Sequence, residues 1–167
     1  LTNPASPKHM AVGCANRAMS PIMAAVYAAN GQTGMVYTSS EGLDEMAPTG
    51  PVSIWEFSNG KVTESEFDPT MELGLDKVTV ADLKGGEPEL NAQLFRDFLA
   101  GKDVPFRTTA LLNAASAIVA DGHQVPADAS LTERFKAAYA IAEETVDSGK
   151  ASALLDQWIT AAQSKKA

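Results

Sequence analysis

The stretch HMAVGCANRAMSPIMAAVYAANGQTGMVYTSS, residues 9–40, decides the fold of this 167-residue chain. It opens with a short apolar run, HMAVGCA at 9–15, and closes with another, GMVYTSS at 34–40. Short apolar runs bounded by turn residues are typical of buried strands. A strand, a helical segment and a second strand within about 30 residues match a crossover unit with parallel strands. The chain is therefore predicted to be an α/β protein.

The segment between the two strands carries helix start and stop signals. Ser20 is predicted as the N-cap, because its hydroxyl can accept a hydrogen bond from a free backbone N–H of the first turn. Pro21 suits the first helical position, and Asn30-Gly31 predicts a left-handed stop. The face expected to be buried consists of Ile22, Met23, Val26 and Tyr27.

The rest of the chain divides into a hairpin and a helical region. Residues 51–69, PVSIWEFSNGKVTESEFDP, predict a β-hairpin at a sheet edge, because Asn59-Gly60 is the preferred type I′ pair. The predicted helices are 88–100, 108–120, 131–147 and a last one ending near 162, with buried faces marked by Leu90, Leu94, Phe98, Leu111, Leu112, Ala115 and Ile118. We expect a mixed or largely parallel sheet flanked by helices, with an edge hairpin and a helical C-terminal layer.

The composition favours one globular domain and disfavours several classes of partner. The chain is 45% hydrophobic and 20% charged, which suits a single packed core. Its 13 basic and 21 acidic residues give a net charge of −8, which disfavours nucleic acid. The sequence shows neither the roughly 20 apolar residues of a membrane span nor a signal-peptide pattern, so we expect a cytoplasmic protein without membrane contact. The single cysteine, Cys14, is interpreted as a small buried hydrophobe.

Two adjacent carboxylates, Asp44 and Glu45, follow the second strand in the segment SSEGLDEMAPTGP, residues 39–51. Ligands of open α/β sheets bind beyond the carboxyl ends of strands, which is where this segment lies. Like charges this close raise each other's proton affinity unless a cation lies between them. Mg²⁺ is bound by one or two carboxylates together with water and phosphate oxygens, so the turn is a candidate magnesium site for a diphosphate. The alternative is a solvated acidic turn.

Other candidate residues carry weaker patterns. His9 and His123 are more than a hundred residues apart, with no acid or nucleophile at motif spacing, so no triad is indicated. The segment KGGE, 84–87, either presents amides to an anion or forms a simple turn. Asn3-Pro4 and Asn113 are either ligand contacts or loop and helix-end residues. Neither a Walker loop nor a GxGxxG motif occurs.

Four segments resemble the C-terminal half of the anthranilate phosphoribosyltransferase family in their order and spacing: LTNPA at 1–5, GLDEMAPTGP at 42–51, LKGGEPELNA at 83–92 and LLNAASAIV at 111–119. The resemblance implies transfer of phosphoribosyl from phosphoribosyl pyrophosphate to anthranilate, with release of pyrophosphate, in tryptophan biosynthesis. It also implies Mg²⁺ as the cofactor. Such a transfer has an oxocarbenium-like centre, and charge builds on the departing pyrophosphate.

The resemblance also assigns residues. Asp44 and Glu45 match the family's magnesium ligands, and Leu1, Thr2 and Asn3 match the rim of the anthranilate pocket. No general base is assigned. The resemblance further implies a helical N-terminal domain that carries a homodimer contact, and closure of the two domains over the substrates.

Two features depart from the family. Thr38-Ser39 stands where the family usually has His-Gly, and the family's Gly-rich phosphate loop, Lys-His-Gly-Asn segment and anthranilate-contacting arginine all precede the point at which this chain begins. Lys8 and Arg17 are the only basic residues among the first 60, so the cations that grip phosphate are expected elsewhere. Residues 1–167 are therefore interpreted as the C-terminal portion of the α/β domain of a longer enzyme. The helical domain and the first part of the α/β domain would lie upstream.

Three alternatives remain open. A pyrimidine-nucleoside phosphorylase of the same fold would use phosphate in place of pyrophosphate, but the LTNPA and GLDE pair argues against it. A non-catalytic phosphoribosyltransferase-like protein that binds nucleic acid would need a basic surface, and the net charge of −8 argues against that. The third alternative is a portion that has no activity of its own and needs the upstream half.

Overall fold

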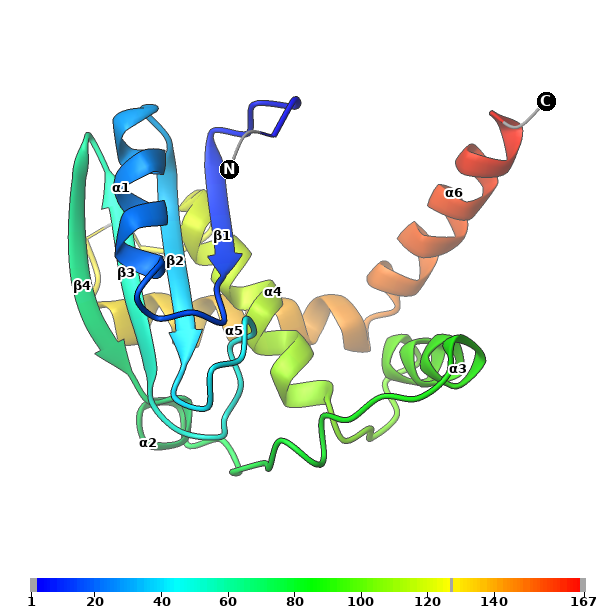
Figure 1. Cartoon of the computed structure of the whole chain (residues 1–167). Coiled ribbons are helices and arrows are strands. Elements are labelled where there is room, and N and C mark those ends of the chain that lie inside the picture. The colour runs from blue at the N-terminus through cyan, green and yellow to red at the C-terminus, as the bar shows by residue number, and fades with distance from the viewer. Residues whose placement is uncertain (1–2, 127, 166–167) are drawn as a thin grey trace.

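A four-stranded mixed sheet runs through the computed structural model, which describes residues 3–126 and 128–165 (Figure 1). Its strand order is β1-β2-β3-β4. β1 and β2 are parallel and are joined by helix α1, whereas the pairs β2–β3 and β3–β4 are antiparallel. These elements span β1 His9–Gly13, α1 Ser20–Ala29, β2 Thr33–Ser39, β3 Val52–Ser58 and β4 Lys61–Phe67. The predicted strand, helix and parallel strand, followed by a hairpin, are confirmed.

The sheet is buried on both of its faces. Val36 of β2 packs with Trp55 and Phe57 of β3 beneath α1. Met35 and Tyr37, the neighbours of Val36, pack on the opposite face against the later helices. This alternation follows from the two-residue repeat of a strand, and it explains why β2 reads as a continuous apolar run.

Helix α1 has the predicted extent but a different orientation. Its N-cap residue is Met19, and the predicted N-cap, Ser20, is instead fully buried in the first turn. Ile22, expected in the core, is 54% exposed. The buried face is made by Ser20, Ala24, Tyr27 and Ala28, because small residues let the helix lie close to the sheet. The predictions for Ser20 and Ile22 were therefore wrong.

The turn between β3 and β4 has the predicted type I′ conformation. Asn59 and Gly60 have φ angles of 50° and 74°, which are both in the left-handed region. This turn matches the twist of the two strands it joins. It places β4 at the edge of the sheet, where most of its side chains are exposed.

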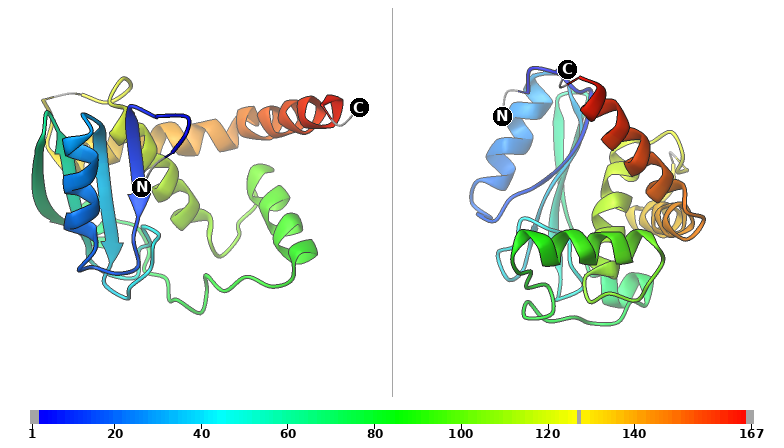
Figure 2. Two further views of the ribbon diagram at one scale, coloured as in Figure 1. Left: turned by 45° about the horizontal axis from the view of Figure 1, so that its top comes forward. Right: turned by 90° about the vertical axis from the view of Figure 1, so that its right-hand side faces the viewer.

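Helices α4 and α5 cover the sheet face opposite α1 (Figures 1 and 2). The predicted helices are confirmed to within two residues, as α3 Pro88–Leu99, α4 Arg107–Asp121, α5 Leu131–Asp147 and α6 Lys150–Ser164. A short helix, α2 Pro69–Leu73, was not predicted. The carboxylate of Asp68 caps α2 by accepting hydrogen bonds from the backbone N–H groups of Thr70 and Met71. Among the described residues, no helix has both the length and the apolar character needed to cross a membrane.

Helices α3 and α6 lie at the periphery. α3 packs through its last turn, Phe98 and Leu99, so Leu90 at its start is 53% exposed and the prediction of its burial was wrong. None of the described residues of α6 is buried, and Leu154 and Trp158 on this helix are 66% and 71% exposed. α6 extends away from the sheet (Figure 2).

Candidate functional site

The acidic turn, residues 40–51, joins the carboxyl end of β2 to β3, as the strand order of the sequence predicted (Figure 1). Asp44 and Glu45 are both exposed. Within the described residues, neither carboxylate makes a hydrogen bond or an ion pair. Two unpaired carboxylates at this position are available to a cation.

The backbone of the acidic turn is held at several points although its side chains are free. The Ser39 hydroxyl donates to the carbonyl of Glu45, and the Ser39 N–H donates to the carbonyl of Leu43 at 3.2 Å. Gly13, at the end of β1, lies against the turn so closely that a Cβ there would stand 1.6 Å from the carbonyl oxygen of Asp44. The turn therefore rests on the end of β1, where only glycine leaves room.

Asn113 of α4 binds the same turn from the other side. Its Oδ1 accepts from the N–H of Met46 at 3.0 Å and from the Tyr37 hydroxyl at 2.9 Å. Its Nδ2 donates to the carbonyls of Met46 at 3.0 Å and Thr109 at 2.8 Å. The sequence left Asn113 open as a ligand contact or a helix-end residue. It lies in the middle of α4, and its amide is fully occupied within the protein.

The two residues that replace the family's His-Gly are structural. Thr38 and Ser39 are 4% and 2% exposed. The Thr38 hydroxyl donates to the carbonyl of Cys14 at 2.7 Å and lies 2.6 Å from the Ser20 hydroxyl. These contacts join the end of β2 to the end of β1 and to the first turn of α1. The buried position of Ser20 thus has a specific partner.

Cys14 follows β1 directly and is only partly buried, so the expected full burial was wrong. Its side chain packs against the core beneath α1, and its thiol donates to the carbonyl of Asn16 at 3.3 Å. The structural role of Cys14 stays a prediction.

A cavity of about 450 Å³ adjoins the acidic turn. Glu45 borders it together with Lys84, Phe95 of α3 and Phe106, the N-cap residue of α4. Thr109 also lines it, and the Thr109 hydroxyl is buried with no hydrogen-bond partner in the described part of the chain. The cavity combines apolar walls with a charged rim.

The KGGE segment, 84–87, is closed by a side chain. Asn91 accepts from the N–H of Gly86 at 2.9 Å and donates to the carbonyl of Gly86 at 2.8 Å. The Gly86 amide is therefore not free for an anion, and the interpretation of this segment as a simple turn is favoured.

The residues of the acidic turn fit a magnesium ion. Carboxylate oxygens are the hard ligands that Mg²⁺ prefers, and Asp44 and Glu45 present them at the rim of the turn without competing partners. The described residues contain no group of three His, Cys, Asp or Glu side chains that could hold a metal. The remaining ligand positions would therefore belong to water and phosphate oxygens.

The predicted substrate-contact residues lie elsewhere. Leu1 and Thr2 are outside the described residues. Asn3 is exposed, and its side chain accepts a hydrogen bond from the N–H of Ala5 at 2.9 Å. Asn3 borders a cavity together with Asn30 and Gln32, which precede β2, whereas the acidic turn lies beyond the end of β2. The two are at opposite ends of the sheet, and the structure does not bring them together.

The structure does bring the two histidines together. The rings of His9 and His123 meet edge to face with their centroids 5.8 Å apart. His9 pairs with the Thr33 hydroxyl at 2.8 Å, and His123 with the Asp121 carboxylate at 3.1 Å. No spacing in the sequence indicated this contact, because more than a hundred residues separate the two rings.

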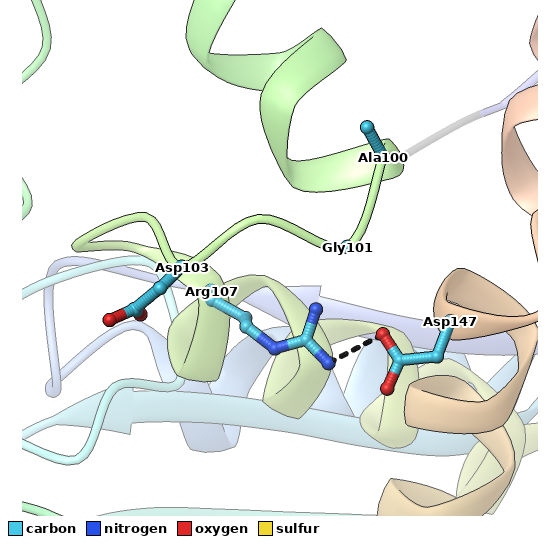
Figure 3. Close-up of a pocket in the computed structure, with 5 residues that line it drawn as sticks. All are labelled: Ala100, Gly101, Asp103, Arg107 and Asp147. Atoms are coloured by element: carbon cyan, nitrogen blue, oxygen red, sulfur yellow. Dashed lines mark hydrogen bonds and ion pairs between the residues drawn. The ribbon is translucent and has the colours of Figure 1, made fainter.

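A second cavity, of about 540 Å³, lies where α3, α4 and α5 meet (Figure 3). Arg107 crosses it and donates to the Asp147 carboxylate at 2.8 Å, and Asp103 is a further acidic wall residue. The Nη2 of Arg107 is paired with the carboxylates of Asp147 and Glu143, whereas its Nη1 is buried with no hydrogen-bond partner among the described residues. This cavity is therefore a helix junction held by an ion pair.

The fold and the acidic turn together describe an α/β domain with a candidate cation site beyond the carboxyl end of β2. The family described as "Glycosyl transferase family, a/b domain" matches residues 1–152. The chain therefore belongs to this glycosyl transferase family.

Individual relatives narrow the similarity. The chain is 47% identical over 159 residues to an anthranilate phosphoribosyltransferase of Arthrobacter sp. (strain FB24), covering 95% of this chain and 44% of that protein. It is 42% identical over 162 residues to the enzyme of the same name from Salinispora arenicola, covering 97% of this chain and 45% of that protein. The chain thus spans less than half the length of the curated relatives it matches.

Solved structures agree with this similarity. Anthranilate phosphoribosyltransferase from Thermus thermophilus has a TM-score of 0.75 at 29% identity, covering 89% of this chain and 41% of that one. The enzyme from Saccharomyces cerevisiae in complex with PRPP and Mg has a TM-score of 0.78 at 23% identity, covering 92% of this chain and 42% of that one. The second likeness establishes the fold alone.

Proposed function

We propose that this chain is the C-terminal α/β portion of an anthranilate phosphoribosyltransferase, which transfers phosphoribosyl from phosphoribosyl pyrophosphate to anthranilate with Mg²⁺. The observation that carries the proposal is the pair of free carboxylates, Asp44 and Glu45, on a fixed turn beyond the carboxyl end of β2. The names of the relatives support the reaction, and the PRPP and Mg bound by the yeast enzyme support the substrate and cofactor.

In this reaction the chain would supply the acidic side of the site. Bound at the turn, Mg²⁺ would offset the charge that builds on the departing pyrophosphate. Asp44 and Glu45 would hold it through carboxylate oxygens. The contacts of Ser39, Gly13 and Asn113 keep the backbone of the turn in place before the ligand arrives, so only the two side chains have to be ordered on binding.

The cationic side of the site is proposed to come from an upstream portion of the same polypeptide. Arg17 is occupied, because it pairs with Glu64 at 3.1 Å and lies over the Trp55 ring at 5.3 Å. Lys8 lies before β1, at the end of the sheet away from the acidic turn. Lys8 is therefore away from the acidic turn, and Arg17, which follows the carboxyl end of β1, is already paired with Glu64.

The surface of the chain supports the same conclusion. β1 pairs only with β2 in the described sheet, so its outer edge is open. Leu154 and Trp158 of α6 are exposed apolar side chains. An upstream portion that packs beside β1 and α6 would cover both. The homodimer contact in an upstream helical domain, and work in the cytoplasm in tryptophan biosynthesis, are further parts of the proposal that rest on the family resemblance.

The test is to express residues 1–167 alone and joined to the upstream portion, and to follow the fluorescence of anthranilate in the presence of phosphoribosyl pyrophosphate and Mg²⁺. We expect consumption of anthranilate only by the joined protein. Steady consumption by residues 1–167 alone would contradict the division of the site between two portions. A well-folded joined protein that consumes no anthranilate would contradict the function itself.

A further inference from the structure

Asn113 makes an unusual set of contacts for a residue in the middle of a helix. The side-chain amide of Asn113 binds both backbone polar groups of Met46. It accepts from the N–H and donates to the carbonyl, at 3.0 Å each. The Tyr37 hydroxyl donates to the same Oδ1, and Nδ2 also reaches the Thr109 carbonyl. An amide offers two acceptor sites and two donors, so every one of them is used.

The residue that Asn113 binds is directly next to the proposed metal ligands. Met46 follows Glu45 in the chain, and its side chain is fully buried in the main core. A side chain locked in the core and a backbone bound on both polar groups leave Met46 little freedom. Glu45 and Asp44 extend from this fixed point, with their carboxylates exposed.

Asn113 is itself held by a rigid element. Its neighbours Leu111 and Leu112 are 1% and 0% exposed, so this part of α4 is packed into the core. A site is held more accurately when its support comes from a packed helix than when it comes from a loop. Asparagine is a poor helix former and would be replaced without loss if only the helix mattered.

We propose that Asn113 is a positioning residue of the metal site: through Met46 it sets where the carboxylates of Asp44 and Glu45 lie, and so sets the affinity of the acidic turn for a divalent cation. This inference rests on the proposed function. It adds to that function a residue on α4 that acts on the cation through Met46 rather than as one of its carboxylate ligands.

The test uses the full-length protein that contains this chain, with Mn²⁺ as a paramagnetic probe for the divalent cation. In Asn113→Ala, we expect the Kd for Mn²⁺ to rise about tenfold, the change that corresponds to the loss of one to two net hydrogen bonds. In the metal-free protein we also expect faster hydrogen exchange at residues 43–47. Val119→Ala is the matched control. Val119 is a buried residue of the same helix, and its apolar side chain cannot form a hydrogen bond with the turn. It should lower the Tm and leave the Kd within about twofold.

Tyr37→Phe keeps the inference testable if Asn113→Ala does not fold. It removes one of the two donors to Oδ1 and leaves both contacts with Met46, so a rise in Kd of about two- to threefold is expected. An unchanged Kd for Mn²⁺ in both variants, with unchanged exchange at 43–47, would overturn the role of Asn113.

The double variant Asp44→Ala/Glu45→Ala separates this inference from the proposed function. If it abolishes Mn²⁺ binding while Asn113→Ala leaves binding unchanged, the positioning role fails and the metal site stands. If it leaves Mn²⁺ binding unchanged, the metal assignment fails and the positioning role fails with it.

Discussion

The acidic turn and helix α6 are both exposed, but they are exposed in opposite ways. In the turn, the backbone is bound by Ser39 and Asn113 and pressed against Gly13, and only the charged side chains reach solvent. In α6, no described residue is buried, and the side chains that reach solvent include the large apolar Leu154 and Trp158.

This difference indicates two kinds of partner. A fixed backbone with free carboxylates suits a small charged ligand, because the geometry is in place and only water has to be displaced. A row of apolar side chains on a weakly packed helix suits a large apolar surface, because burial of that area is the available driving force. Under the proposed function, the acidic turn serves as the cation site and α6 as a surface for a protein segment.

The largest expected effect concerns the acidic turn. Replacing both Asp44 and Glu45 with Ala in the full-length protein should lower turnover by about a hundredfold or more, because charge on the leaving group would be left without its cation. The free energy of unfolding should change by less than about 0.5 kcal/mol, since exposed carboxylates without partners do not support a core. Steady-state kinetics across a Mg²⁺ titration and urea unfolding measure the two quantities.

The control for this double variant is Glu66→Ala/Asp128→Ala. It removes the same charge from exposed positions on β4 and in the loop before α5 and should leave turnover unchanged. An unaltered requirement for Mg²⁺ in the Asp44 and Glu45 variant would contradict the proposal that the acidic turn binds this ion.

The next effect concerns the backbone of the turn. Gly13→Ala places a methyl group 1.6 Å from the carbonyl oxygen of Asp44, so the turn or the end of β1 must move. We expect a loss of about 1–3 kcal/mol in the free energy of unfolding, as for other overpacked sites. Gly86→Ala is the control, since its new methyl group would meet only the end of the flexible Leu90 side chain. Equal stability of the two variants in urea unfolding would show that the turn is not pressed against β1.

The effect on α6 should be smaller. Leu154→Gln/Trp158→Gln in residues 1–167 should change the free energy of unfolding by less than about 0.5 kcal/mol, because both side chains are mostly exposed. The same variant should bind less of a hydrophobic dye and associate less with the upstream portion. Unchanged association in a pull-down with that portion would argue against α6 as its contact surface.

The smallest effect is a pH dependence at Tyr37. Burial raises the pKa of Tyr37 above its usual value of 10.0, and the nearby carboxylates of Glu45 and Asp44 raise it further. The neutral hydroxyl therefore stabilises the fold fully below pH 10, and this contribution is lost as the pH rises through the folded-state pKa. Above about pH 10, the parent protein should lose stability relative to Tyr37→Phe, which has no phenol to titrate. Urea unfolding measures the difference in the free energy of unfolding between the two proteins. A difference that stays constant as the pH rises above about 10 would contradict the raised pKa of Tyr37.

Several features of the fold were accessible from the sequence because their causes are local. The hairpin turn follows from Asn59-Gly60, a pair that tolerates two successive left-handed conformations. α5 begins and ends where it was predicted, at Leu131 and Asp147, because a capping box of Ser130 and Glu133 starts it. Helix α2 was missed although Asp68, Pro69 and Gly74 carry the same kinds of start and stop signals. That signal was present and was read as the end of a hairpin.

The misplaced side chains have a different origin. Ile22 and Leu90 were expected in the core because they are apolar and fit a helical period, yet both are more than half exposed. Helical periodicity defines a stripe, but the neighbouring elements decide which part of the stripe is covered. α1 turns its small residues to the sheet, and α3 reaches the core only through its last turn.

The sequence by itself determined the strand, helix and strand order, the hairpin, the four long helices, and the place of Asp44 and Glu45 beyond a strand's carboxyl end, because these depend on residues close together in the chain. Only the tertiary structure decided what holds that pair in place. Gly13, Ser39 and Asn113 meet the acidic turn from three different elements. Such contacts depend on how the elements pack in three dimensions, and no spacing within a single sequence encodes the distance between them.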